Sequence, residues 1–264
     1  MTQWVAAVVL FVASVTPAVG ADPRGALAHA RAMYNERNFD AAIEAAEEAR
    51  TALDQEDSAD LVAARALLER YRASGAPDDL TQARERLRRL TPERFAPRER
   101  LEFVVGLGEA LYFDSAPGAA AAIFDSVLAS GDLSLVGGRD LLLDWWASAV
   151  DQDARPRMEF ERYALYGKVH ERMIEELAIN PASGPAAYWA VAAARGRGDI
   201  NSAWDAAQAG WVRAPLAPDH GAALRGDLDR LVQRAIIPER ARTLGQSPEA
   251  LREEWEQFKA KWSK

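Results

Sequence analysis

The sequence predicts an all-α chain made of stacked helix pairs. After residue 21, apolar residues recur at spacings of three and four, which is the period of an amphipathic helix. Alanine is abundant and runs of β-branched residues are few in this part of the chain. Segments of similar pattern also return along the sequence, so we expect repeats of one helical unit that bury their apolar faces against each other.

Residues 1–21 have the pattern of a signal peptide. The segment Trp4–Val15 is apolar apart from Ser14, and it is shorter than the roughly 20 residues that a membrane-spanning helix needs. Val19-Gly20-Ala21 supplies the small residues of a cleavage site. We therefore predict export to the periplasm or secretion, with cleavage near Ala21 and no membrane insertion afterwards. Because no Lys or Arg precedes the apolar run, an uncleaved N-terminal membrane anchor is the alternative.

The composition excludes several kinds of protein. The chain has no cysteine, so neither disulfides nor thiolate-bound metals contribute to the fold. The formal net charge is −8, and it belongs to the part after the leader because the leader has no charged side chain. This acidic balance argues against a nucleic-acid partner. The Arg-rich run 84–100 and the acidic segment 36–60 are each more typical of a solvated helix face than of a patch for a charged partner.

Three segments share a plan of helix, polar turn and helix. Residues 26–49 have a second apolar stripe that begins at Phe39. Residues 101–128 have a Ser-Ala-Pro-Gly break, followed by Ala120 and then Phe124. We expect the small residue to let the two helices of a pair approach closely while the aromatic ring fills the space between pairs.

The third of these segments, residues 188–215, contains Arg197-Gly198-Asp199. This tripeptide is known from cell-adhesion ligands, but its place in the repeat gives it another role. Glycine tolerates a left-handed backbone at a helix end, and aspartate caps the helix that follows. We therefore predict a turn here, with Ala203 at the close helix crossing.

One irregular helix pair fits into each interval between these segments. Residues 59–75 and 79–90 form the first of them. Residues 139–150 and 156–179 form the second, with Pro156 at the first helical position. Together with the three regular segments, this predicts about five helix pairs within residues 22–216.

Residues 217–264 are expected to cap the stack. The segments 218–236 and 247–264 are both helical in pattern, and Ser247 before Pro248 is a helix-start signal. The second segment has a single apolar stripe formed by Leu251, Trp255, Phe258 and Trp262.

The pattern resembles the tetratricopeptide-repeat (TPR) family, whose motif runs W-x2-L-G-x2-Y, then A-x3-F, then P. The resemblance is carried by Leu107-Gly108 with Ala120 and Phe124, Asn38-Phe39 with Ala42, and Gly198-Asp199 with Ala203 and Pro215. Leu111 replaces the tyrosine of the motif, and Ala46 and Ala207 replace its second aromatic residue. The resemblance implies an exported bacterial TPR protein, folded as a right-handed α-solenoid of antiparallel helix pairs.

No catalytic, metal or cofactor site is predicted. His170-Glu171 begins like the zinc-protease helix motif, but Ile174 stands where the second histidine would be needed. Gly106-x-Gly108 and Gly196-x-Gly198 lack the third glycine and the preceding strand of a dinucleotide loop.

Adjacent tryptophans pose a packing problem. Trp145 and Trp146 are neighbours in a predicted helix, where adjacent side chains point to different faces. We expect one of the two to be exposed and the other to join Trp189, Trp204 and Trp211 in the core.

In TPR proteins the first helix of each pair lines an inner groove, so the resemblance implies a binding surface there. The matching residues are Arg31, Tyr34, Glu109, Tyr112, Tyr188 and Arg195. The family's clamp for a C-terminal carboxylate needs Lys and Asn, but its positions hold Leu27, Arg31, Val105 and Glu109. Binding of a C-terminal carboxylate is therefore not expected.

The expected function is that of a non-catalytic scaffold or adaptor in the bacterial cell envelope, with a protein or peptide partner in this groove. Two alternatives remain open. One is an envelope enzyme whose site uses carboxylates such as Glu109 and Asp144. The other is a structural subunit of a larger envelope complex.

Overall fold

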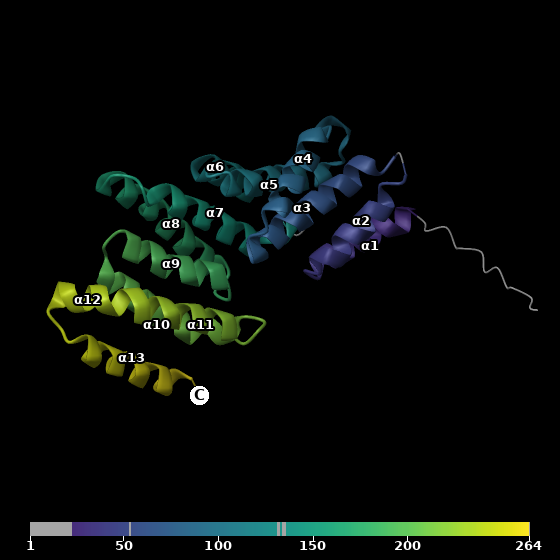
Figure 1. Ribbon diagram of the computed structural model, residues 1–264. Helices are drawn as coiled ribbons and strands as arrows, with labels where there is room; N and C mark the ends of the chain where they lie inside the picture. Colours follow the sequence, from purple (N-terminus) through teal and green to yellow (C-terminus); the bar gives the residue numbers. More distant parts are fainter. Residues whose placement is uncertain (1–22, 53, 131–132, 134–135, 264) are drawn as a thin grey trace, which may run out of the picture.

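The computed structural model describes residues 23–52, 54–130, 133 and 136–263 (Figure 1). All secondary structure within these residues is helical, which confirms the prediction of an all-α protein. The predicted leader, residues 1–21 with a cleavage site near Ala21, lies outside this part of the chain. Across the described ranges, no helix is long and apolar enough to cross a membrane.

The helices follow one another along the chain. They are α1 (Pro23–Asn35), α2 (Phe39–Ala49), α3 (Glu56–Ser74), α4 (Pro77–Arg89), α5 (Pro97–Phe113), α6 (Pro117–Leu128), α7 (Arg139–Ala154), α8 (Glu159–Ile179), α9 (Gly184–Gly196), α10 (Ile200–Arg213), α11 (Ala222–Leu231), α12 (Ile237–Leu244) and α13 (Pro248–Trp262). Short 3-10 turns lie at Pro92–Arg94 and Ala214–Leu216, and a π-helical segment spans Val232–Ile236.

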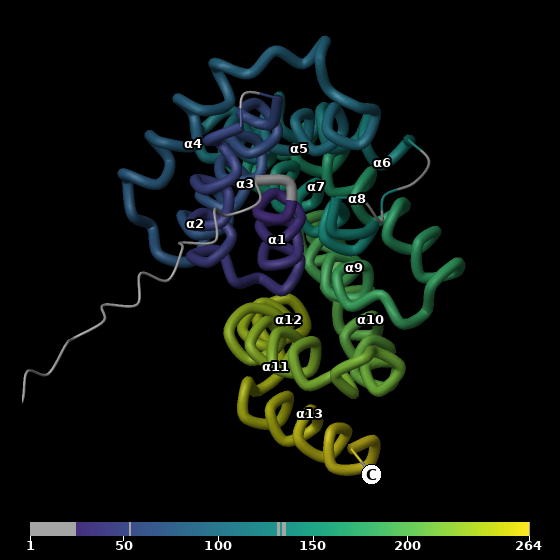
Figure 2. The backbone as a smooth tube through the Cα atoms, turned by 90° about the vertical axis from the view of Figure 1, so that its right-hand side faces the viewer, coloured from purple at the N-terminus to yellow at the C-terminus, as the bar shows by residue number. Residues whose placement is uncertain are grey.

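Consecutive helices pack in neighbouring pairs. The odd-numbered helices also contact one another, because α3 contacts both α1 and α5, and α9 contacts both α7 and α11. Figure 2 shows α1, α3 and α7 near the middle of the molecule, and α4 and α6 toward its periphery. The odd-numbered helices therefore form an inner row, and the even-numbered helices from α2 to α10 cover it. This repeat-like arrangement fits an α-solenoid.

The predicted turns are confirmed. Gly198 has a φ of +77°, and Asp199 caps α10 by accepting a hydrogen bond from the backbone N–H of Ser202 at 3.0 Å. Ala203 is fully buried. Asn38 caps α2 in the same way at the first pair. Arg197-Gly198-Asp199 is therefore the connection between two packed helices.

The close approach of α5 and α6 depends on Gly108. A Cβ atom at this position would lie 2.8 Å from the ring carbon Cε1 of Phe124, which is too close for any side chain. Phe124 and Ala120 are fully buried at this crossing. Ala120 and Phe124 are thus buried as expected, and the contact that requires a small residue is that of Gly108 with Phe124.

The inner row has a step between α5 and α7. Tyr112, at the C-terminal end of α5, packs edge-on against Trp145 in the N-terminal half of α7, with ring centroids 5.2 Å apart. By contrast, α7 and α9 lie in register, since Ser183 before α9 donates a hydrogen bond to Asp140 at the start of α7 at 2.7 Å. We call this offset of α7 along α5 the α7 step.

The prediction that one of Trp145 and Trp146 is exposed is wrong, because both side chains are buried. They do point to different faces, but α7 has neighbours on both. Trp145 packs against rings of α5 and α6, including Phe124 at 5.8 Å. Trp146 is covered from α8 by Arg172, whose Cζ lies 4.5 Å above the ring, and by Lys168. Long cationic side chains thus supply the second cover that the apolar pattern did not reveal.

The predicted start of α8 is also wrong. Pro156 lies in a turn, and the helix begins at Glu159 with Met158 as its N-cap. Glu161 accepts a hydrogen bond from the backbone N–H of Met158 at 3.3 Å, which satisfies a donor that the helix itself leaves free. This side-chain cap sets the boundary in place of the proline.

The C-terminal cap is longer than the predicted 218–236. Helical structure continues from α11 through the π-helical segment Val232–Ile236 into α12, which ends at Leu244. Pro238 explains the widened turn, because proline has no N–H and its ring crowds the carbonyl one turn earlier. Ser247 then caps α13, as predicted, through its hydroxyl and the N–H of Glu249 at 3.2 Å.

Candidate functional site

A hollow at the inner row lies beside the α7 step. It is a cavity of about 520 Å³, formed by the turn between α1 and α2, the C-terminal part of α3, and the N-terminal ends of α7 and α9. Its lining consists of Arg37, Phe39, Glu69, Arg72, Ala73, Asp140, Leu141, Asp144 and Pro185. A second cavity of about 180 Å³ shares four of these residues and adds Tyr34, Asn35 and Gly137. We refer to the two cavities together as the groove.

The turn between α1 and α2 places two contrasting side chains at the groove. Arg37 has a φ of +62°, a left-handed conformation that non-glycine residues seldom adopt. Phe39 follows as the first residue of α2, and its ring packs 5.8 Å from that of Tyr34. A strained cationic residue and an aromatic ring thus lie together on one wall of the groove.

A set of polar contacts, which we call the polar tie, crosses the opposite wall of the groove. Arg72 of α3 pairs with Asp144 of α7 at 2.8 Å, and its Cζ lies 4.4 Å above the ring of Trp145. Trp189 of α9 donates its indole N–H to the other oxygen of Asp144 at 2.9 Å. This tie joins three inner helices, and both members of its ion pair keep about a third of their surface exposed.

A buried polar cluster lies next to the groove, between α1, α3 and α5. Glu109 is fully buried, and its nearest cation is Arg65, whose Nη2 lies 3.9 Å from Oε1. The Cζ of Arg65 lies 4.6 Å above the ring of Tyr34. Neither Glu109 oxygen, nor the Tyr34 hydroxyl, nor Nε and Nη2 of Arg65 has a hydrogen-bond partner among the described residues.

Burial dominates the electrostatics of this cluster. Desolvation raises the pKa of Glu109 to about 8, the positive charge of Arg65 works in the opposite direction, and the nearby Glu69 raises the pKa further. Desolvation likewise raises the pKa of the Tyr34 hydroxyl. A buried carboxyl group that is protonated at neutral pH costs folding free energy, and such groups concentrate at functional sites.

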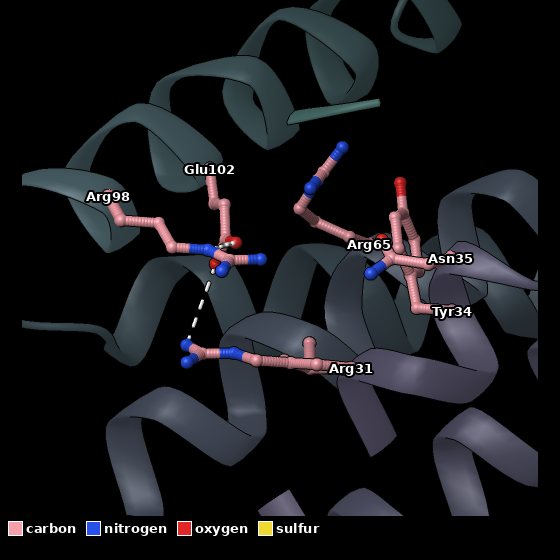
Figure 3. A pocket seen from close by; sticks show the side chains of 7 residues that line it. Arg31, Tyr34, Asn35, Arg65, Arg98 and Glu102 are labelled. Carbon is pink, nitrogen blue, oxygen red and sulfur yellow. Dashed lines mark hydrogen bonds and ion pairs between the residues drawn. The ribbon is translucent and has the colours of Figure 1, made fainter. Parts of the chain in front are cut away.

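At the other side of Tyr34, the polar side chains are paired. A small cavity of about 10 Å³, the size of one water molecule, lies among Arg31, Tyr34, Arg98 and Glu102 (Figure 3). Arg31 pairs with Glu99 at 2.8 Å and Arg98 with Glu102 at 2.8 Å. The charge of Arg31 is therefore used within the fold.

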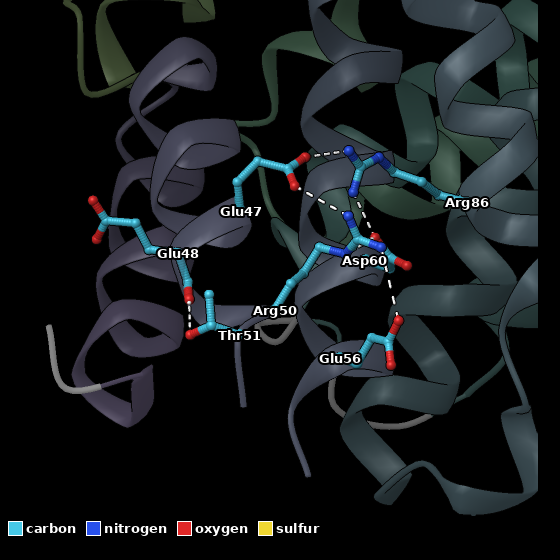
Figure 4. Close-up of polar contacts among 7 residues, drawn as sticks. All are labelled: Glu47, Glu48, Arg50, Thr51, Glu56, Asp60 and Arg86. Atoms are coloured by element: carbon cyan, nitrogen blue, oxygen red, sulfur yellow. Dashed lines mark hydrogen bonds and ion pairs between the residues drawn. The ribbon is translucent and has the colours of Figure 1, made fainter. Parts of the chain in front are cut away.

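Some residues of the acidic segment 36–60 form ion pairs with residues of the Arg-rich run 84–100. Arg86 of α4 pairs with Asp60 of α3 at 2.5 Å and also with Glu47 of α2 (Figure 4). Arg50 adds a second cation at 2.9 Å from the same Asp60 carboxylate. The expectation of two merely solvated faces is therefore wrong at this point, because buried Asp60 and Arg86 meet where α4 packs against α3.

The sequence-predicted binding residues occupy several separate places. Tyr34 lines the groove, Glu109 lies in the polar cluster beside it, and Arg31 lines the small cavity on the other side of Tyr34. Tyr112 is half-buried at the α7 step, and Tyr188 is half-buried with its ring 5.4 Å from that of Trp189. Arg195 lies at the far end of α9, where it pairs with Glu239 at 2.6 Å.

Several groove residues were not predicted from the sequence. Arg37, Arg72 and Leu141 lie near helix ends, and the α7 step brings these ends together. Asp144 was noted only as one of several scattered carboxylates. No sequence pattern marks these residues as neighbours, because contacts between the ends of distant helices leave no periodic trace.

Comparisons with known proteins add no further assignment, since no protein family, no curated protein and no solved structure matches the chain. Within the described part of the chain, no group of three or more His, Cys, Asp or Glu side chains is placed to hold a metal ion. The geometry itself is therefore the basis for a functional assignment. It offers a mixed apolar and charged groove with an aromatic wall.

Proposed function

We propose that the protein is a TPR-like, right-handed α-solenoid that binds a polypeptide segment in the groove, as a non-catalytic adaptor of the bacterial envelope. The observation that supports this most is the cavity of about 520 Å³ on the inner row. Its volume lies within the range of about 300–1,000 Å³ that is typical of ligand sites. Its walls come from helices far apart in the sequence, as in the extended concave surfaces of repeat proteins.

The chemistry of the groove suits a peptide better than a small metabolite. Phe39, Leu141 and Pro185 offer apolar contact area, while Arg37, Arg72 and Asp144 offer both charge signs along the same surface. An extended peptide can place successive apolar and charged side chains, together with its backbone polar groups, against these groove residues. Arginine and aromatic residues are also the usual energetic centres of protein interfaces.

A site-specific crosslink tests this proposal. A photo-crosslinking amino acid replaces Leu141 in the groove, and a matched protein carries it at Glu171, an exposed position on α8. We expect a polypeptide adduct of defined mass from position 141 in the native envelope fraction, and Arg72→Gln should reduce its yield. Equal adducts from both positions, or none from position 141, would contradict the proposal.

An envelope enzyme is the second candidate, and one observation favours it. The pKa of Glu109 is raised to about 8, as is typical of catalytic carboxylates. Both oxygens of this carboxyl group are buried, however, so a substrate has no direct access to them. Turnover by the purified protein that Glu109→Gln abolishes without unfolding would support the enzyme. The role of a structural subunit of a larger complex would instead require co-purification at fixed stoichiometry.

A further inference from the structure

A second hollow lies at the opposite ends of α7 and α9 from the groove. It is a cavity of about 390 Å³ at the corner where α7 ends, α8 begins and α9 turns into α10. Four arginines and two tyrosines line it together with two carboxylates: Arg155, Arg162, Arg195, Arg197, Tyr163, Tyr166, Glu159 and Glu239. We call this surface, together with the exposed start of α8, the α8 corner.

An aromatic ring held against glycine lies within this corner. A Cβ atom on Gly196 would lie 2.6 Å from the ring carbon Cδ2 of Tyr166, so the ring rests directly on the backbone at the end of α9. The hydroxyl of Tyr166 donates a hydrogen bond to Asp151 at 2.7 Å. This ring is therefore fixed from two directions.

Two of the four arginines already have carboxylate partners. Arg195 pairs with Glu239 at 2.6 Å, and Arg155 pairs with Asp151 at 2.5 Å. The other two have hydrogen-bonding capacity to spare. Arg162 has no side-chain partner among the described residues. Arg197 donates from Nη2 to the hydroxyl of Tyr163 at 3.0 Å and forms no ion pair within that part of the chain.

Large apolar side chains are exposed beside these arginines. Met158, Phe160 and Tyr163 are 69%, 75% and 53% exposed, and all three lie at or next to the first turns of α8. Phe160 and Tyr163 are three residues apart, so they neighbour each other on the helix surface. Clustered exposure of this kind marks an interaction surface rather than the scattered apolar residues of an ordinary surface.

We propose that the α8 corner docks a polypeptide segment in which an Asp or Glu side chain adjoins a large apolar side chain. The carboxylate accepts hydrogen bonds from Arg162 and Arg197, because guanidinium groups match carboxylates in both charge and geometry. The apolar side chain of the segment covers Phe160 and Met158. This second contact makes the protein a connector with two separate binding surfaces.

The charge distribution favours such a segment over an anionic membrane. Asp151 and Asp153 neutralise Arg155 and Arg157, leaving few unpaired cations on the outer surface of the corner. Attraction to an anionic bilayer increases with each unpaired cation near its surface. Among the described residues, the cavity holds two arginines without an ion pair, Arg162 and Arg197, against one such carboxylate, Glu159, so it suits a single incoming carboxylate instead.

A random linear peptide library panned against the purified protein tests the proposal. We expect enriched peptides in which Asp or Glu adjoins an aromatic or large aliphatic residue. For a synthetic consensus peptide, Arg162→Gln and Phe160→Ser should each weaken binding about tenfold, as is usual for central arginine and aromatic contacts. Replacing the acidic residue of the peptide by its amide should have a similar effect.

Matched variants separate this surface from others. Arg213→Gln and Ile179→Ser remove an exposed arginine and an exposed apolar side chain elsewhere, and they should leave binding unchanged. Leu141→Ser in the groove should also leave it unchanged. Enrichment of no motif with an acidic residue, loss of consensus-peptide binding in Leu141→Ser, or full binding in both Arg162→Gln and Phe160→Ser would overturn the proposal.

Two further results would assign the corner to another occupant and overturn the proposal as well. One is binding to phosphatidylglycerol vesicles that depends on Arg162 and Phe160 while no acidic peptide binds. The other is self-association in sedimentation experiments that Phe160→Ser abolishes.

Discussion

The helices α1–α5 and the helices α7–α13 are stabilised in different ways. The first group has buried charged residues, namely Asp60, Arg65, Glu69, Asp79, Arg86, Glu102 and Glu109, whereas Glu176 is the buried charged residue found in the described part of the second. Every tryptophan after Trp4, from Trp145 onward, lies in the second group. The same helical repeat is thus stabilised mainly by charge pairs in α1–α5 and mainly by buried aromatic area in α7–α13.

This difference follows from what each kind of interaction can do. Aromatic burial depends on area and tolerates small shifts, so it gives a stable body. Buried charges require particular partners at particular distances, and one left unpaired costs several kcal/mol. The groove lies where the two groups of helices meet, and its polar side chains come from the charge-paired side as well as from α7. The aromatic helices therefore give rigid support to one side of the groove, while polar side chains that can change partners line the other side.

The largest expected effect is in the aromatic half. Trp204 is almost fully buried, with its ring centroid 5.7 Å from that of Trp255. Trp204→Ala should lower the free energy of unfolding by about 3–5 kcal/mol, because it leaves a large cavity. Urea denaturation measures the change. Trp262→Ala, at a position that is 46% exposed, is the matched control and should cost less than about 1 kcal/mol.

In the charge-paired half, Asp60→Asn should cost about 2–3 kcal/mol. The substitution keeps the shape of the side chain but removes the anion between Arg86 and Arg50. Asp40→Asn removes an exposed partner of Arg70 and should cost less than about 1 kcal/mol. Equal losses in the two variants would show that burial does not distinguish these pairs.

Glu109→Gln should change how stability depends on pH. Since burial raises the pKa of Glu109 to about 8, the native state holds a proton that the unfolded state has lost above its ordinary carboxyl pKa. The free energy of unfolding therefore falls as pH rises toward and through 8. At pH 9 the Gln variant should be more stable than the wild type by on the order of 1–2 kcal/mol.

Thermal unfolding of both proteins between pH 7 and 9 provides the measurement. This window avoids His170, whose pKa is lowered from its usual value by burial and by Arg197. Parallel pH profiles for wild type and Glu109→Gln would mean that Glu109 is ionised in the folded protein.

Salt should produce the smallest difference between the two groups. Arg70 pairs with Asp79 at 2.6 Å and with Asp40 at 2.7 Å, and about a third of its side chain is exposed, so sodium chloride screens these pairs. We expect amide hydrogen exchange in α2–α4 to accelerate about twofold at high salt, equivalent to less than 0.5 kcal/mol. Exchange in α9 and α10 should stay the same or slow down. The reverse order would contradict the division into two groups.

Local features were predictable from the sequence, whereas the relation between distant helices was not. The turn at Gly198-Asp199 and the crossing at Ala120 depend on neighbouring residues, so motif and periodicity were sufficient. The α7 step depends on how far one helix slides along another, and the apolar pattern of α7 is compatible with several positions. The groove at this step was therefore missed, although Tyr34, one of the predicted binding residues, lies on its wall.

The burial of both Trp145 and Trp146 illustrates the same limit. Helical geometry predicts correctly that their side chains point to different faces. It gives no information on whether another helix covers each face. In this protein Arg72 and Arg172 from two different helices cover the rings, and such cation–π contacts leave no periodic trace in the sequence.

The ion pair between Arg72 and Asp144 also has a mechanical consequence. It joins the second helix pair to the fourth and, through Trp189, to the fifth, bypassing the third. The curvature of a solenoid accumulates from small rotations between neighbouring units, so a bond that skips a unit fixes several rotations at once. The ion pair therefore restricts how far these helix pairs can rotate relative to one another. We expect loss of this ion pair to free these rotations and to let the molecule lengthen. Small-angle X-ray scattering of Asp144→Asn, which removes the anion, should therefore show a longer molecule. A basic side chain of a partner that binds Asp144 in place of Arg72 should have the same effect.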